Sequence, residues 1–281
     1  MSYSDFEWRG PDGMRIFACE WRPPEGVPVK AAIGIVHGMG EHSGRYRHVA
    51  EMLIAEGYAV LVYDQPGHGR TEGLRGHAES YEVLLDQVGL LLDELDRRYP
   101  KLPRFLYAHS MGGNVALNYL LRRKPKLNGA VVTGPWLKLA FTPPPVQVFM
   151  GRIMNRIYPK FTNKRPLVAE HLTSDPEMAK LYVEDPLGHG SISVRFFFDV
   201  DRAGLWALEH AGELSVDLLL MHGSDDQVTS ILASKQFAER AGSLCTFMEW
   251  PGYRHELHNE LGREEVFAAM RQWLSGHLEQ H

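Results

Sequence analysis

Six stretches of the chain carry an almost unbroken run of apolar residues, each four to seven residues long. Such runs are typical of strands that are buried on both faces, the arrangement found in parallel sheets. Near the N-terminus the pattern instead alternates on either side of a Pro- and Gly-containing turn, which predicts a hairpin over Phe6–Arg9 and Met14–Trp21. The six predicted strands are Ala31–His37, Tyr58–Asp64, Arg104–Ala108, Ala130–Thr133, Val216–His222 and Leu244–Trp250.

Helical periodicity separates these runs. Over Ser80–Tyr99 the apolar residues recur at intervals of three and four, which places them on one stripe of a helix. Similar stripes occur in four further segments. Strands that alternate with helices predict βαβ units, and therefore an α/β fold with helices on both faces of a mostly parallel sheet. The four further segments are Tyr46–Glu56, Met111–Arg123, Ser230–Ala241 and Asn259–Leu278.

One long segment, residues 135–213, breaks this alternation. It contains no convincing buried strand, and prolines divide it into short helical pieces. We therefore expect a helical cap inserted between two parts of a core, 1–134 and 214–281. A purely structural excursion is the alternative, although long connections of this kind are usually functional.

The composition excludes several classes of protein. The chain has 281 residues, 44% of them hydrophobic, which is typical of a globular protein. A formal net charge of −5 disfavours a nucleic-acid partner. The first residues show no basic stretch followed by an apolar one, so the expected location is cytoplasmic, with Cys19 and Cys245 as free thiols.

The segment Phe105–Asn114 joins a predicted strand to a predicted helix and carries Ser110 between small residues. A serine in such a tight turn is the pattern of a nucleophile elbow, which exposes the hydroxyl at the carboxyl edge of the sheet. Ala108 stands where the usual pattern has glycine, a difference of one methyl group. We expect the neighbouring His109 to be a histidine of the elbow or the core.

A serine nucleophile needs a histidine base and an acid, and in this type of fold they follow the serine in the order acid, then histidine. Asp225 and Asp226 both follow the strand that ends at His222, so either could be the acid. After the last strand, His255 is the candidate base and His258 its rival. The spacing of the two histidines also suits a metal pair, but no further ligand follows at a suitable spacing, so we predict no metal site.

Acyl transfer also requires two backbone N–H groups that point at the developing oxyanion. One is expected from Met111, the residue after the nucleophile. The other is expected from the glycine-rich loop after the first long strand, His37–Tyr46, where Met39 is the candidate. The alternative is an ordinary glycine turn.

Together these segments resemble the α/β-hydrolase superfamily, and more narrowly its monoacylglycerol lipase and lysophospholipase-like branch. The resemblance extends from about residue 5 to about residue 276 and implies the α/β-hydrolase fold, with an eight-stranded, mostly parallel sheet and a helical cap. The matching motifs are His37–Tyr46, Asp64–Gly73, His109–Gly113, Gly223–Asp226 and His255–Glu260.

The resemblance assigns roles to particular residues. It implies Asp226 as the acid, His255 as the base, and Met39 and Met111 as the oxyanion donors. Candidate substrate-binding residues are Glu41, Arg45 and Tyr182, with bracing of the loop as the first role of Glu41 and Arg45. The family's acid for the glycerol head group falls on Met178, a departure that bears on head-group recognition.

The expected function is hydrolysis of carboxylic esters of monoacyl lipids through an acyl-enzyme, with a small-molecule substrate and without a cofactor. Two alternatives are an aminopeptidase of the proline iminopeptidase type and a non-catalytic α/β-hydrolase-like binding protein. Apolar residues early in the cap either pack it onto the core or line an acyl pocket whose mouth contacts a membrane surface transiently. These residues are Leu137, Leu139, Ala140, Phe141, Val146, Val148, Phe149 and Met150.

Overall fold

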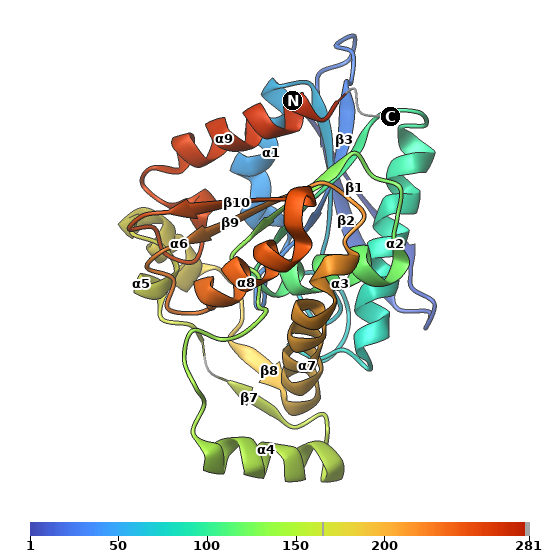
Figure 1. Cartoon of the computed structure of the whole chain (residues 1–281). Coiled ribbons are helices and arrows are strands. Elements are labelled where there is room, and N and C mark those ends of the chain that lie inside the picture. The colour runs from blue at the N-terminus through green and yellow to red at the C-terminus, as the bar shows by residue number, and fades with distance from the viewer. Residues whose placement is uncertain (165, 279–281) are drawn as a thin grey trace.

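The computed structural model describes residues 1–164 and 166–278, and its centre is an eight-stranded sheet in the order β1-β2-β4-β3-β5-β6-β9-β10 (Figure 1). The hairpin of β1 and β2 is antiparallel, β2 is antiparallel to β4, and the remaining neighbours are parallel. The α/β prediction is therefore confirmed. The strands are β1 Ser2–Arg9, β2 Arg15–Arg22, β3 Ala31–Val36, β4 Tyr58–Tyr63, β5 Arg104–His109, β6 Gly129–Thr133, β9 Leu218–Gly223 and β10 Cys245–Trp250.

Helices cover both faces of this sheet. On one face α1 and α9 pack against the strands, and on the other α2, α3, α7 and α8 do so (Figure 1). The continuous apolar runs make this possible, because each residue of β3, β4, β6 and β9 is buried. The helices are α1 Arg47–Ala55, α2 Tyr81–Arg98, α3 Ser110–Arg123, α7 Val194–His210, α8 Ile231–Ala241 and α9 Arg263–Gly276.

Serine side chains cap the start of two of the long helices. Ser80 caps α2 by accepting a hydrogen bond from the N–H of Val83, and Ser230 caps α8 in the same way. The prediction placed the start of the last helix too early. The chain forms a short 3₁₀ turn, Leu257–Asn259, before α9 begins at Arg263.

The segment between β6 and β9 contains more than helices. It holds a small antiparallel sheet of β7, Thr162–Lys164, and β8, Ser191–Ser193, which the sequence pattern did not predict. Three residues are too few to show a period of two, which explains the omission. Its helices besides α7 are α4 Pro145–Ile157, α5 Ala169–Leu172 and α6 Pro176–Glu184.

Two ends of this segment contact the core differently. Near β8, the carbonyl of Gly40 accepts a hydrogen bond from the N–H of His189, and a side chain at Gly40 would place its Cβ 2.1 Å from the His189 carbonyl oxygen. By contrast, α4 has no buried residue and lies at the bottom of Figure 1, beyond β7 and β8. The β8 end is therefore tightly docked, whereas α4 presents apolar side chains outward.

Both cysteines are free thiols, Cys19 buried and Cys245 partly buried, as expected. Among the described residues, every helix falls short of the length and apolar character needed to cross a membrane.

Candidate active site

Ser110 begins α3 directly after β5 ends at His109. Its φ is +55°, a left-handed conformation that non-glycine residues seldom adopt and that tight functional turns retain. Gly112 and Gly113 follow, and a Cβ at Gly112 would lie 2.3 Å from the carbonyl oxygen of Val36. The small residues thus let α3 pack closely against β3, as the elbow pattern requires.

Ser110, His255 and Asp226 meet beyond the carboxyl edge of the sheet. The Oγ atom of Ser110 lies 2.8 Å from Nε2 of His255, and Nδ1 of His255 lies 2.7 Å from Oδ2 of Asp226. Ser110 is the first residue of α3 after β5, whereas His255 and Asp226 lie on the loops after β10 and after β9. This is the geometry of a serine nucleophile with an oriented general base.

The two neighbouring aspartates differ in burial and in contacts. Asp226 is buried, and its Oδ1 accepts hydrogen bonds from the N–H groups of Val228 and Thr229. Asp225 is exposed and accepts a hydrogen bond from the hydroxyl of Ser224. Only Asp226 of the two contacts His255.

Electrostatics favour an ionised acid beside a basic histidine. Burial by itself would raise the pKa of Asp226, but the neighbouring His255 and His222 hold this pKa well below its ordinary value. Burial by itself would lower the pKa of His255, but the carboxylate of Asp226 raises the pKa of His255 above its ordinary value. The histidine is therefore a stronger base than a free imidazole.

His222 was not predicted as a site residue. Its Nε2 lies 3.0 Å from Oδ2 of Asp226, and its Nδ1 lies 2.8 Å from Oγ of Ser234. A polar residue at the end of an otherwise apolar strand, β9, was the available signal. We interpret His222 as a second contact that fixes the Asp226 carboxylate.

The other two candidate histidines, His109 and His258, contact residues of the core. His109 is buried, and its Nδ1 lies 3.0 Å from Oγ1 of Thr133. The centre of its ring lies 4.7 Å from that of His255, and burial lowers the pKa of His109 to about 3. His258, the rival base, instead has its Nδ1 3.1 Å from the hydroxyl of Tyr107. Both rings pack beneath the site.

The loop after β3 approaches the nucleophile closely. A Cβ at Gly38 would lie 3.3 Å from the Cβ of Ser110, so glycine permits this approach. Met39 and Ser110 line the same cavity, and Met111 occupies the first turn of α3. Of the two predicted oxyanion donors, Met39 thus lies on a loop that reaches the same cavity as Ser110, and Met111 directly follows Ser110 in the chain.

A cavity of about 370 Å³ opens at Ser110, and its lining is mostly apolar. Of the apolar cap residues predicted to form such a surface, Leu139, Phe141 and Val148 line it. Leu137 is instead buried in the core, while Val146, Phe149 and Met150 are exposed. Further apolar lining comes from Trp136, Phe197 and Phe198.

Residues 27–262 match the family described as serine aminopeptidase, S33. A monoacylglycerol lipase of Mycolicibacterium smegmatis is 30% identical, and the match covers 98% of each chain. The chain belongs to the monoacylglycerol lipase branch of the α/β-hydrolases.

Two further comparisons fit this membership. The crystal structure of a Paleococcus ferrophilus monoacylglycerol lipase is similar, with a TM-score of 0.84 and 30% identity over 93% of this chain and 99% of that one. An uncharacterized abhydrolase domain-containing protein of Dictyostelium discoideum is 32% identical over 92% of this chain, which spans 27% of that longer protein. The α/β-hydrolase fold predicted from the sequence is therefore shown by sequence and by structure.

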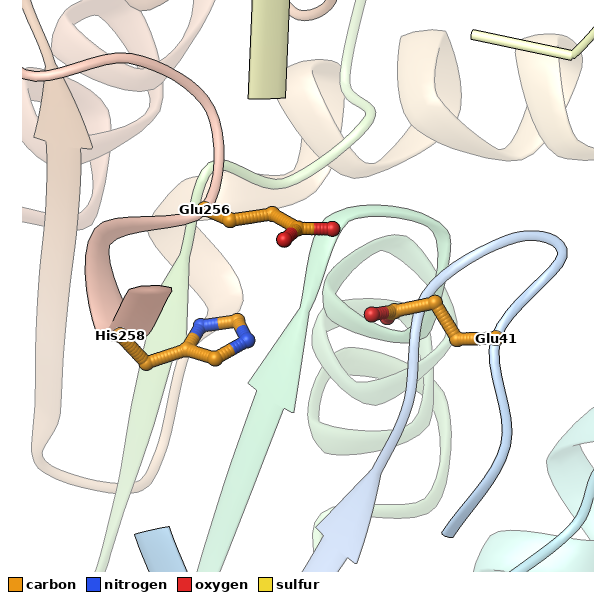
Figure 2. A group of neighbouring side chains, drawn as sticks. All are labelled: Glu41, Glu256 and His258. Carbon is orange, nitrogen blue, oxygen red and sulfur yellow. The ribbon is translucent and has the colours of Figure 1, made fainter. Parts of the chain in front are cut away.

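In this α/β-hydrolase, Glu41, Glu256 and His258 form a buried cluster whose possible ligand atoms lie within 4.8 Å of one another (Figure 2). Sequence spacing could not reveal it, because Glu41 lies on the loop after β3. Arg45 forms an ion pair with each carboxylate, with Nε 2.9 Å from Glu41 Oε1 and Nη2 2.9 Å from Glu256 Oε2. A resident guanidinium thus supplies the positive charge that a metal ion would bring.

Glu41, Arg45 and Tyr182, the three predicted substrate-binding residues, lie differently with respect to the cavity. Neither Glu41 nor Arg45 lines the cavity, whereas Tyr182 does, with the guanidinium of Arg45 5.1 Å from the centre of its ring. Oε2 of Glu41 accepts hydrogen bonds from the N–H of Gly38 and the hydroxyl of Tyr46. The charged groups of Glu41 and Arg45 are engaged in contacts that hold the loop in place. Bracing of the loop was the first of the two roles expected for them.

Proposed function

We propose that this α/β-hydrolase cleaves carboxylic esters of monoacyl lipids, with Ser110 as nucleophile, His255 as general base and Asp226 as the orienting acid. The contact chain from Ser110 Oγ through His255 to Asp226 carries this proposal. A serine hydroxyl is a weak nucleophile until such a base accepts its proton.

The reaction follows from the positions of these groups. Ser110 Oγ attacks the ester carbonyl carbon while its proton passes to Nε2 of His255. The N–H groups of Met39 and Met111 stabilise the oxyanion, each by about 3 kcal/mol. His255 then protonates the leaving alcohol, and water activated by the same imidazole releases the fatty acid. Asp226 keeps the proton on Nδ1 and stabilises the imidazolium.

The cavity supports a single acyl chain as the apolar part of the substrate. Its volume of about 370 Å³ lies at the small end of ligand pockets, and its walls are mostly apolar. The relatives named monoacylglycerol lipase support the same substrate class. Of the three predicted substrate-binding residues, Tyr182 lines this cavity, and we propose it as a contact of the substrate head group.

We propose residues 135–213 as a cap whose α4 contacts the lipid surface that supplies the substrate. Val146, Phe149 and Ile157 of α4 are 74%, 63% and 75% exposed. Exposed apolar side chains on one helix are typical of a surface that meets a membrane or a partner. Cytoplasmic location stays a prediction from the N-terminal sequence.

The test compares esters with an amide substrate, because the matching family is described as a serine aminopeptidase. We expect hydrolysis of monoacylglycerols and p-nitrophenyl esters, with kcat of Ser110→Ala lower by about 10⁴–10⁶-fold. Faster turnover of proline naphthylamide would favour the aminopeptidase instead. Equal ester hydrolysis by Ser110→Ala and the parent would favour a non-catalytic binding protein.

A further inference from the structure

A second cavity, of about 740 Å³, lies at the opposite edge of the sheet from Ser110. It is bounded by the loops that lead into β5, β6 and β9, whose amino ends meet there because the three strands are parallel. Its volume is within the range of small-molecule sites. The proposed hydrolase reaction makes no use of it.

The lining of this cavity carries an excess of positive charge, although the chain as a whole has a formal net charge of −5. Four cationic side chains line it, against the single carboxylate of Asp96. Apolar residues form much of the remaining wall, among them Leu102, Leu127 and Leu278, and Asn128 and Ser215 add polar groups. The four cationic residues are Lys101, Arg104, Lys124 and Lys126.

Ion pairs account for only part of this charge. Arg104 lies 3.1 Å from Asp96, and Lys124 lies 3.7 Å from Glu213. Within residues 1–164 and 166–278, Lys101 and Lys126 have no ion-pair partner. Each follows its helix by three residues, beyond the last turn where a cation stabilises the helix dipole most. Their charges are therefore available to a ligand.

The backbone conformation gives an independent indication that lysines of this cavity have a function. Among the described residues three non-glycine residues have left-handed φ values: Ser110 at +55°, Lys101 at +68° and Lys124 at +47°. Glycine is the usual residue at such positions after a helix, because it adopts this conformation without strain. The chain instead uses lysine twice, and both lysines line the same cavity. Retained strain of this kind is frequent where the side chain has a function.

We propose that this cavity, which we name the basal cleft, binds a small organic polyphosphate, with its phosphates on Lys101, Lys124 and Lys126 and its apolar body against Leu102 and Leu127. A multivalent anion satisfies the unpaired Lys101 and Lys126 and also reaches Lys124, whose exposed pair with Glu213 spans 3.7 Å. The apolar part of the wall requires more than an inorganic ion. The concave shape favours a free small molecule over a lipid head group. This site goes beyond the proposed ester hydrolysis and does not depend on it.

The test measures binding of ATP to the full-length chain, without magnesium, by isothermal titration calorimetry. Lys101→Gly/Lys124→Gly removes two charges and relieves two strained positions, so the thermal midpoint should not fall. We expect ATP to bind about tenfold more weakly to this variant and to Lys126→Ala, and in each case more weakly at higher salt. Lys138→Ala/Lys180→Ala, which removes two exposed lysines of the segment between β6 and β9, is the matched control and should bind ATP like the parent.

Three results would overturn the proposal. The first is absence of ATP binding by the parent, and the second is equal ATP binding by the double glycine variant. The third is binding of anionic phospholipid vesicles, but not of ATP, through the same lysines. Ester hydrolysis, measured in parallel, should be unchanged in the double glycine variant, so this test is separate from that of the active site.

Discussion

Arg45 Nη2 lies 2.9 Å from Oε2 of Glu256, and this contact joins the loop after β3 to the residue that follows His255. The same guanidinium reaches Glu41, whose other oxygen accepts the N–H of Gly38. One buried cation thus connects the loop that approaches Ser110 with the loop that carries the proposed base. The pKa values fit this arrangement: burial raises the pKa of Glu256, whereas Arg45 and nearby histidines, acting against burial, lower the pKa of Glu41.

Replacement of Arg45 by methionine should destabilise the protein strongly. It leaves two carboxylates buried without their counter-ion, a change that typically costs about 3–5 kcal/mol. The free energy of unfolding in urea measures this loss. Arg47→Met is the matched control, because the Arg47–Glu51 pair is exposed and should contribute no more than about 1 kcal/mol. Equal losses in the two variants would show that the buried network adds nothing.

The sequence predicted most features that depend on a short motif, but few contacts between residues that lie far apart in the chain. Ser110, Asp226 and His255 each follow a strand within a short motif, so order along the chain and the carboxyl edge of the sheet predicted where the three groups would meet. The choice of Asp226 over Asp225, and of His255 over His258, came from the resemblance to the family. The contact of Arg45 with Glu256 joins residues 211 positions apart, and that of His222 with Asp226 depends on how β9 faces the site. Such contacts follow from packing in three dimensions, which no spacing along the chain expresses.

The pH dependence of kcat/KM should show a single acid limb with a midpoint above about 6.5, the ordinary value for histidine. The pKa of His255 is raised, because the attraction of Asp226 outweighs burial, and the protonated imidazole cannot accept the proton of Ser110. Groups that face His255 include Asp226, Glu256, Glu41 and the ring of His109. A pH–rate profile of the parent enzyme from about pH 5 to 9 measures the midpoint.

Asp226→Asn supplies the control for this prediction. Without the carboxylate the acid limb should move to lower pH, and kcat should fall by about 10⁴-fold because the wrong tautomer of the histidine is favoured. The raised pKa of His255 also predicts how the stability of the folded protein depends on pH. Since folding raises the pKa of His255, its protonated form contributes stability below about pH 6.5, and this contribution disappears as the pH rises through the folded-state value. If the midpoint of the acid limb is the same in Asp226→Asn as in the parent, the assignment of Asp226 as the acid is contradicted.

Gly40→Ala should impair catalysis through the loop that carries Met39. The new Cβ would lie 2.1 Å from the carbonyl oxygen of His189, and the residue has a φ of +74°. The loop must therefore shift, and loss of one oxyanion donor lowers kcat by about 10²–10³-fold. Gly26→Ala has a similar φ of +86° but no atom within 4 Å of the new Cβ, so it reproduces the strain without the displacement. We expect kcat for a soluble ester to fall only in Gly40→Ala; parallel losses would indicate a general effect of backbone strain.

Val146→Ser/Ile157→Ser should weaken association with lipid vesicles without affecting hydrolysis of a short soluble ester. The two side chains are among the most exposed apolar groups of the chain, and both belong to α4, which contributes no buried residue to the fold. Burial of a large aliphatic side chain in an apolar phase is worth about 1.5–3 kcal/mol, so loss of two should reduce vesicle binding at least tenfold. Flotation with mixed phosphatidylcholine and phosphatidylglycerol vesicles measures this binding. Val27→Ser is the control, because Val27 is an exposed apolar residue shortly before β3, at the other edge of the sheet, and this variant should bind vesicles like the parent. A similar loss of vesicle binding in Val27→Ser would contradict the proposal that α4 contacts the membrane.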